Sequence, residues 1–456
     1  MNRNPFFLFI FLCLINFCFN KFKIDSIPYD YIFWANCNFW LHSLPILHFV
    51  LAGYKKEIFP FIGLLGGFLM ISFSLPIYFI NPTNYQLGIL SVEALKLSFW
   101  AYTVFYFFYF VFRYINIFKL NPFSPIDNKN ELFKARKLAL VFLMIHVIDL
   151  FVLPGTSLHH IAQLGVYIYL GTYLTILNTK SKIQFWEKWL FYLFLIYEYF
   201  SRAFNGLIAV LALLTVFLIL IDFFTRRSLL RIMFFIVPFM VLYLVMAPIK
   251  SEFRQMVWLD TKSYSMIDRF ILIKDLYLQY KDKIDLSDIS SQDNDRNNFF
   301  WRFSYQASAF SFVLQETPDN VPYYGGKSYS FFSKFIPRFI WPGKPREDMG
   351  YIFGTRYSII SHDNTTTSMN LPILTEMYMN FGKLGIFIGM ILLSLVYLFL
   401  NNYLNQKKIS MVNQVYSISI LFAFVNVESN FTLTFGNLPL LLVSIYLITK
   451  KTIKFK

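Results

Sequence analysis

The sequence predicts an all-α polytopic membrane protein of about twelve transmembrane helices, with one large helical extracytoplasmic loop. Of its 456 residues, 57% are hydrophobic and only 15% are charged, which is more apolar surface than a soluble domain of this length buries. Runs of about 18 or more apolar residues recur along the chain, and such runs are long enough to cross a bilayer. One long, aromatic, mixed-charge stretch, Lys250–Gly382, separates nine of these runs from the last three.

The predicted spans share an apolar core bounded by polar or charged residues. They cover residues 5–19, 31–53, 58–80, 95–117, 137–155, 161–179, 184–200, 206–224, 229–248, 383–400, 411–430 and 437–449. The first follows Met1-Asn2-Arg3 like a signal peptide, but no small-residue cleavage site follows it. We therefore expect a retained anchor.

Basic residues predict the orientation of the chain. Lysines and arginines cluster in alternate connections, all on one side if the N-terminus is cytoplasmic: Lys55, Lys56, Lys134, Arg136, Lys137, Lys180, Lys182, Arg226, Arg227, Lys407, Lys408, Lys450 and Lys451. Positive residues are retained on the cytoplasmic side of membrane proteins. We expect both termini in the cytoplasm and three regions: spans 1–248, an external loop 249–382 and spans 383–456.

Composition also excludes some classes of function. The net charge of +15 would favour nucleic acid in a soluble protein, but basic residues beside apolar spans set orientation and meet anionic lipid instead. The three cysteines lie in or beside apolar segments and predict neither a disulfide framework nor a metal site. No nucleotide-binding or metalloprotease motif is present, so we expect no metal and no cofactor.

The external loop has the pattern of a folded region. Apolar residues recur at helical spacing over 264–280 and 297–315, and both stretches predict amphipathic helices. Three prolines in 336–346 predict a stiff extended segment. Residues 282–296 form an acidic, polar stretch that we expect to be an exposed flap.

Four cations are candidates for binding an anionic substrate. Arg202 lies at the outer end of the predicted span 184–200, where a charge either faces a cavity or reaches the interface beside Glu198. In the loop, Arg302 shares a helix face with Gln306, and prolines flank both Arg338 and Lys344. Each cation alone has a loop carboxylate as an alternative partner. For the set we favour binding of a diphosphate, since arginine matches phosphate oxygens bidentately.

Glu376 and Asn380 are spaced to share one face of the helix that re-enters the membrane. A carboxylate at this depth either accepts a proton from a sugar hydroxyl, as a general base, or orients one of the arginines. Of these two roles for Glu376, we slightly favour the orientation of an arginine. Gly382, Gly385 and Gly389 permit close approach of a neighbouring helix.

Three stretches resemble a known family. GGKSY and IPRFIWPGKP within 325–345, and TEMYMNFGKLG at 375–385, resemble the bacterial oligosaccharide-repeat-unit polymerases, the Wzy-type O-antigen and enterobacterial common-antigen polymerases. YFSRAFNGLIAVLALL, at 199–214, resembles the wider O-antigen polymerase–ligase superfamily.

The resemblance implies a metal-independent, GT-C-like membrane glycosyltransferase in the bacterial inner membrane, with its loop in the periplasm. Its substrate would be an undecaprenyl-diphosphate-linked oligosaccharide, polymerised into O-antigen or a similar surface polysaccharide by inverting transfer. A flippase and a chain-length-regulating co-polymerase are implied partners. The motif matches assign Arg202, Arg302, Arg338 and Lys344 to the diphosphate, Glu376, Arg338 and Arg302 to catalysis, and Tyr329, Trp341 and Asn380 to the sugar or the scaffold.

Rival functions stay open. An O-antigen ligase would use the same donor with lipid A–core as the acceptor, and IPRFIWPGKP favours the polymerase modestly. A polysaccharide flippase or other transporter predicts related halves and a continuous polar path, and neither is visible in the sequence. A scaffold whose loop binds a partner is the third alternative.

Overall fold

The computed structural model describes the chain in segments. They are residues 5–52, 60–85, 87–118, 128–152, 159–178, 184–226, 232–259, 264–280, 303–329, 341, 343, 348–363, 367–405, 418–419, 422–425, 427–436 and 438. Within these segments every regular element is a helix, and one isolated bridge joins Tyr85 and Gly88. The expected all-α fold is confirmed.

The chain forms two compact units, each assembled from separate stretches of sequence. Unit 1 contains residues 1–123, 295–408 and 423–444, and unit 2 contains residues 124–294, 409–422 and 445–456. The boundary therefore divides the predicted loop 249–382, whose first part joins unit 2 and whose second part joins unit 1. The three regions expected from the sequence stay a prediction.

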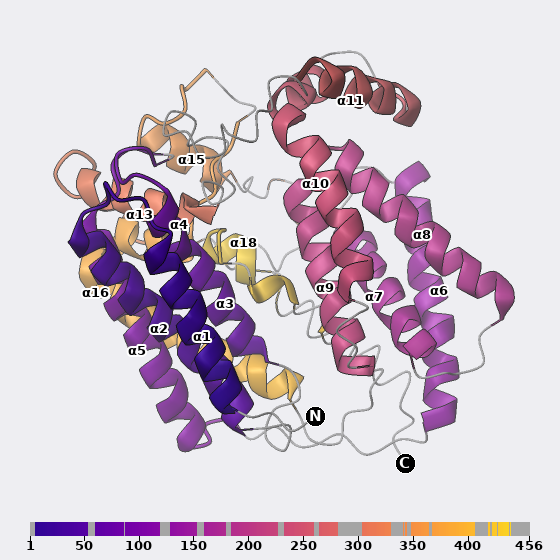
Figure 1. Cartoon of the computed structure of the whole chain (residues 1–456), viewed down its shortest axis with the longest axis horizontal. Coiled ribbons are helices and arrows are strands. Elements are labelled where there is room, and N and C mark those ends of the chain that lie inside the picture. Colours follow the sequence, from indigo (N-terminus) through magenta and orange to yellow (C-terminus); the bar gives the residue numbers. More distant parts are fainter. Residues whose placement is uncertain are drawn as a thin grey trace. The chain divides into compact units, whose positions relative to one another are not determined.

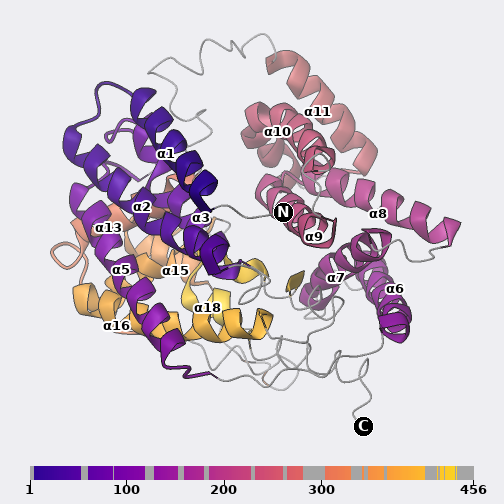
Figure 2. The same ribbon diagram turned by 60° about the horizontal axis from the view of Figure 1, so that its bottom comes forward.

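Unit 1 is a bundle of long helices with short helices at one end (Figure 1). Its helices are α1 (Pro5–Lys21), α2 (Tyr29–Ala52), α3 (Phe61–Phe73), α4 (Leu75–Phe79), α5 (Val92–Tyr114), α13 (Tyr305–Glu316), α15 (Met349–Arg356), α16 (Ile373–Leu404) and α18 (Phe431–Phe435). Helix α2 packs on α1, α3 and α5, and α5 packs on α16 (Figure 2). Gly66 permits the contact between α3 and α2, because a Cβ there would lie 2.5 Å from the His42 carbonyl oxygen.

Unit 2 contains the remaining long helices: α6 (Asn128–Val152), α7 (His159–Asn178), α8 (Phe185–Phe204), α9 (Ile208–Arg226), α10 (Ile232–Arg254) and α11 (Met266–Tyr280). A π-helical turn, Gln255–Leu259, extends α10. Helix α11 then packs across the end of α10 (Figure 1), where Ile273 and Leu276 join a core with Met246, Ile249 and Phe253. The helix predicted over 264–280 is confirmed as α11. Of the helix predicted over 297–315, the part from Tyr305 is confirmed as α13, and residues 297–302 lie outside the described residues.

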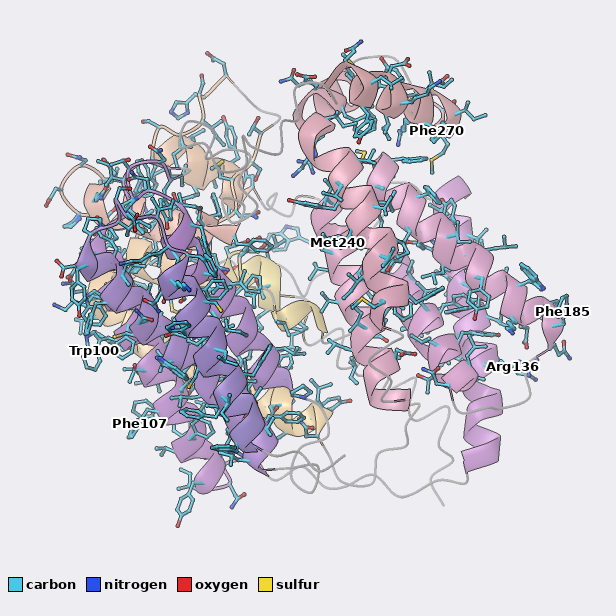
Figure 3. All side chains as sticks on the ribbon, viewed as in Figure 1. Trp100, Phe107, Arg136, Phe185, Met240 and Phe270 are labelled. Atoms are coloured by element: carbon cyan, nitrogen blue, oxygen red, sulfur yellow. The ribbon has the colours of Figure 1, made fainter. Side chains whose placement is uncertain are left out.

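The apolar face expected on α11 does not all lie in that core. Ile267, Phe270 and Ile271 are exposed, and Figure 3 shows Phe270 on this helix. The residues that pack on α10 are Ile273 and Leu276, which lie on an adjacent face of the helix. Phe270 still contacts Phe204 of α8, with ring centroids 6.0 Å apart. Periodicity identified the helix correctly, but it did not distinguish the residues that are buried from those that are exposed.

Helices occupy most of the predicted spans, but fewer of them have the composition of a membrane crossing. Among the described residues, three helices are long and apolar enough: Phe61–Phe79 (α3 with α4), Val92–Tyr114 and Ile373–Leu404. Three shorter apolar helices cover Leu8–Lys21, Val210–Asp222 and Met233–Met246. Charged residues are one physical reason for the smaller number, since α8 contains Glu187, Lys188, Glu198 and Arg202.

The predicted span 411–430 is wrong as a continuous helix. A 3₁₀ turn covers Phe422–Val425, and the chain is not helical at Val427–Asn430. The Val427 carbonyl accepts a hydrogen bond from the Ile373 amide, 3.3 Å away, at the start of α16. The backbone here pairs with another segment instead of continuing its own helix. Most of the last predicted span, 437–449, lies outside the described residues.

Candidate functional site

A buried polar network joins two of the sequence motifs in unit 1. The Ser328 hydroxyl, in GGKSY, donates to Glu376 Oε1 at 2.6 Å and accepts from Asn380 Nδ2 at 2.8 Å. Asn380 Nδ2 also donates to the Glu376 carbonyl oxygen at 2.8 Å, which confirms that these two residues share a helix face. All three side chains are buried, and Glu376 is 0% exposed. Polar groups at this depth need such partners.

The GGKSY turn docks where α16 changes direction. Phe381 and Gly382 have non-helical backbone angles inside α16. The carbonyls of Met379 and Asn380, next to this kink, accept hydrogen bonds from the Tyr324 and Gly325 amides at 2.9 and 3.2 Å. A kink removes helical partners from nearby carbonyls, so a second segment supplies the missing donors.

Two glycines give the turn its shape. Gly325 and Gly326 have φ of +64° and +83°, a region that side chains disfavour. This conformation points the Gly326 amide at Asn380 Oδ1, 2.8 Å away. The asparagine therefore binds the turn through both ends of its amide, and its role in this structure is to position the backbone.

Glu376 also holds a third segment. Its Oε2 accepts a hydrogen bond from the Phe431 amide at 2.5 Å, at the start of α18. The Thr432 hydroxyl donates to the Ser328 carbonyl at 3.3 Å. Both carboxylate oxygens of Glu376 are thus engaged, so in this structure Glu376 holds the GGKSY turn and the start of α18. Of the arginines that it was expected to orient, Arg202 pairs with Glu198, and Arg302 and Arg338 lie outside the described residues.

A cavity of about 270 Å³, lined by both polar and apolar residues, lies beside this network. Its wall includes Ser328, so the cavity adjoins the buried network directly. The polar lining residues come from the GGKSY turn, the start of α15, the approach to α16 and the start of α18: Lys327, Ser328, Asp348, Ser368, Asn370, Ser429, Asn430 and Thr432. Tyr324, Ile352 and Leu433 add apolar surface. Hydroxyl and amide groups outnumber charged groups in this wall.

Tyr329 closes one side of the network. Its ring stacks on Phe381, with centroids 6.4 Å apart, and meets Phe431 edge-on at 6.1 Å. Burial, together with the nearby Glu376 carboxylate, raises the pKa of Tyr329 well above its usual value. Tyr329 is therefore a neutral phenol. Trp341, the other aromatic residue assigned to the sugar or the scaffold, is about half exposed.

Arg202 lies in unit 2 and is fully engaged there. Its guanidinium forms an ion pair with Glu198 on the preceding turn of α8, with Nη2 2.9 Å from Oε2. It also lies over the ring of Tyr167, 5.7 Å from the centroid. His146 Nε2 lies 3.1 Å from the other Glu198 oxygen. Arg202 is 5% exposed, so its nearest partner is the glutamate that the sequence offered as an alternative.

The other predicted cations, Arg302, Arg338 and Lys344, lie outside the described residues, as does the acidic stretch 282–296.

The structure brings together Glu376, Asn380 and Tyr329 from the predicted site. Sequence reasoning missed Ser328, Lys327 and Asp348. Ser328 and Lys327 stand inside the quoted GGKSY motif, and that position was the available signal. In the part of the chain described, no group of three or more histidine, cysteine, aspartate or glutamate residues comes together as a metal site.

Residues 43–407 match a family described as a domain of unknown function, DUF8712. The chain belongs to this family. No curated protein and no solved structure matches the chain. All of the segments that form the network, except the start of α18, fall inside the matched range.

Proposed function

We propose that this protein is a membrane-embedded glycosyltransferase that polymerises undecaprenyl-diphosphate-linked oligosaccharide repeat units. One observation carries the proposal: GGKSY and TEMYMN, two motifs on which the family resemblance depends, meet in one buried network beside a cavity. Ser328 and Asn380 are 52 residues apart in the chain, so their meeting is a property of the fold. A conformationally fixed turn beside a cavity is suited to holding a substrate in one orientation.

The exterior of the helices supports a membrane setting. Helix α10 exposes Met233, Phe234, Val237, Met240, Val241 and Leu244, and α1 exposes Phe6, Phe9, Phe11, Leu14 and Phe17. Figure 3 shows Trp100 and Phe107 projecting from α5, and both side chains are exposed. Soluble monomers rarely expose apolar surface of this extent. The proposal places a polytopic chain in the bacterial inner membrane, with cytoplasmic termini, a periplasmic loop and an interrupted segment in place of the continuous helix expected over 411–430.

In the proposed reaction, the hydroxyl of an incoming lipid-linked unit attacks the anomeric carbon of the growing chain. The bond from that carbon to the diphosphate oxygen breaks, and undecaprenyl diphosphate leaves with the electron pair. Arg302, Arg338 and Lys344 stabilise the charge that develops on the diphosphate. Glu376 positions the GGKSY turn. Arg202 has a diphosphate role only if Glu198 releases it.

The size distribution of lipid-linked and surface glycan tests the proposal. A strain lacking the gene is complemented with the native chain, with Arg338→Ala, or with Arg346→Ala as a neighbouring control outside the quoted motifs. We expect the native chain and the control to restore a ladder of polymer lengths, and Arg338→Ala to leave a single capped repeat. Full-length polymer retained on the lipid carrier in the deletion strain would indicate a ligase. An unchanged ladder in that strain would refute both enzyme functions and favour a transporter or scaffold.

A further inference from the structure

We propose that the cavity beside Ser328 binds the uncharged saccharide end of the acceptor, and that Asp348 accepts the proton of its attacking hydroxyl. The saccharide-binding part of this inference is argued from the cavity and its lining residues and does not depend on the proposed polymerase function. The role of Asp348 rests on the proposed polymerase function.

The charge of the wall favours a sugar over a diphosphate. Among the described lining residues, Lys327 is the one cation and Asp348 the one anion, so their formal charges cancel. A diphosphate site needs an excess of donors and positive charge. Arg356 is not among the lining residues; its guanidinium lies 4.8 Å from the centroid of the Tyr324 ring and donates a hydrogen bond to the Pro322 carbonyl.

The remaining polar groups match the hydroxyls of a sugar. Serine and threonine hydroxyls both donate and accept, and asparagine amides do the same with separate atoms. Ser368, Asn370, Ser429 and Asn430 provide such groups around the cavity. The apolar surface of Ile352 and Leu433 suits the C–H faces of a pyranose. The volume of about 270 Å³ suits one or two sugar residues rather than a long chain.

Asp348 is the carboxylate that a substrate can reach. Glu376 is fully buried, with one oxygen bound to Ser328 and the other to the Phe431 amide. Asp348 lines the cavity at the start of α15, and its side chain does not cap that helix. A general base must come within hydrogen-bond distance of the proton it removes, and of the two carboxylates only that of Asp348 lines the cavity.

The proton balance of the step is simple. As the acceptor oxygen bonds to the anomeric carbon, its proton passes to the Asp348 carboxylate and the glycosyl–diphosphate bond breaks. The protonated Asp348 then releases its proton to solvent, and the diphosphate carries away the electron pair. No metal or external reagent is needed for this balance.

Two variants separate binding from proton transfer. Asp348→Asn keeps the size of the side chain but removes the base, whereas Ser368→Trp fills the cavity from an exposed position on its wall. Asp319→Asn is the matched control, because Asp319 is an exposed acid outside the lining.

The full-length protein in detergent is titrated with the free repeat-unit oligosaccharide, released from its lipid by mild acid, and separately with inorganic pyrophosphate. Saturation-transfer NMR detects the oligosaccharide. Polymer is measured in complemented cells.

We expect the native protein to bind the oligosaccharide without competition from pyrophosphate. Ser368→Trp should lose both binding and polymer. Asp348→Asn should bind within a few-fold of the native protein but form polymer at least about 100-fold more slowly, the usual loss for a general base. Asp319→Asn should match the native protein in both assays.

Other outcomes overturn the inference in identifiable ways. Normal polymer from Asp348→Asn would remove Asp348 from the reaction, and displacement of the oligosaccharide by pyrophosphate would make the cavity an anion site. Absence of oligosaccharide binding together with normal polymer from Ser368→Trp would refute the saccharide site. If the deletion strain has unchanged glycans but Ser368→Trp still abolishes oligosaccharide binding, the polymerase proposal fails and the saccharide site stands.

Discussion

Ser328 joins segments that are far apart in the chain, because its hydroxyl donates to Glu376 and accepts from Asn380. Its backbone carbonyl accepts from Thr432 as well. A single small side chain thus links the GGKSY turn to α16 and α18. Both Glu376 and Asn380 are buried, so water does not take the place of the Ser328 hydroxyl as their hydrogen-bond partner.

Replacing Ser328 by Ala should lower the free energy of unfolding by about 1–3 kcal/mol, because a buried carboxylate oxygen and an amide donor each lose a partner. Ser368→Ala, at an exposed position on the cavity wall, should change it by less than about 0.5 kcal/mol. Denaturant unfolding of the purified protein in detergent measures both. Equal stability of the two variants would show that the network contributes little.

Arg202 can be tested by removing its partner together with it. Arg202→Ala leaves Glu198 buried without its cation and should destabilise the protein by about 3–5 kcal/mol. The double variant Arg202→Ala/Glu198→Ala removes both charges and should regain part of that loss. Unfolding measurements on the single and double variants check this.

The same double variant separates a structural role from a substrate role. If Arg202 serves only to neutralise Glu198, the stabilised double variant should make normal polymer. A stable double variant without polymer would instead assign Arg202 to the diphosphate. The glycan ladder in complemented cells provides the readout.

At the level of elements, the kink in α16 determines where the GGKSY turn docks. Gly382 has φ of +64° and ψ of −150°, which only glycine adopts without strain. A Cβ at this position would also lie 2.7 Å from the Tyr323 hydroxyl oxygen. The sequence indicated Gly382 as a site of close helix approach. In the structure it is instead a kink against the segment that precedes the turn.

Gly382→Ala should therefore destabilise the protein by about 1–3 kcal/mol and reduce polymer. Gly67→Ala in α3 is the matched control, because the space around its Cβ is open, and it should be neutral or slightly stabilising. Thermal unfolding in detergent and the glycan ladder measure the two effects. If Gly382→Ala retains native stability, the kink is not held by this glycine.

At the scale of the whole molecule, α16 gives the most direct test of topology. Its first turns bind the GGKSY turn, and its last turns lie beside the end of α5, where Asn402 donates to the Phe118 carbonyl. The helix contains 32 residues, which is long enough to cross a bilayer with its two ends on opposite sides. The proposal places its beginning in the periplasm.

Single cysteines in a chain without Cys13, Cys18 and Cys37 test this orientation. Asp319→Cys should react with a membrane-impermeant maleimide in intact spheroplasts, because the proposed topology places the loop outside. Asn405→Cys, just beyond the end of α16, should react only after permeabilisation. Labelling of both positions from outside would exclude α16 as a crossing, and the reverse pattern would invert the proposed topology.

Much of the site was predictable only as separate pieces. The i, i+4 spacing was enough to place Glu376 and Asn380 on one face, since helical periodicity is a local property. The spacing did not identify Ser328 as their common partner. Nor did it indicate Asp348, because nothing in the local sequence distinguishes a cavity-facing acid from a solvated one.

The sequence by itself determined the all-helical class, the helix at 264–280, the part of the predicted helix 297–315 that begins at Tyr305, and the apolar segments, because composition and periodicity act over a few turns of chain. Tertiary structure decided which of those helices have an apolar exterior, where 411–430 breaks, and which motifs meet. These outcomes depend on hydrogen bonds between residues far apart in the chain, such as the amide of Phe431 with Glu376. A kinked helix leaves carbonyls and carboxylates that only a distant segment can satisfy, and local pattern contains no information on which segment does so.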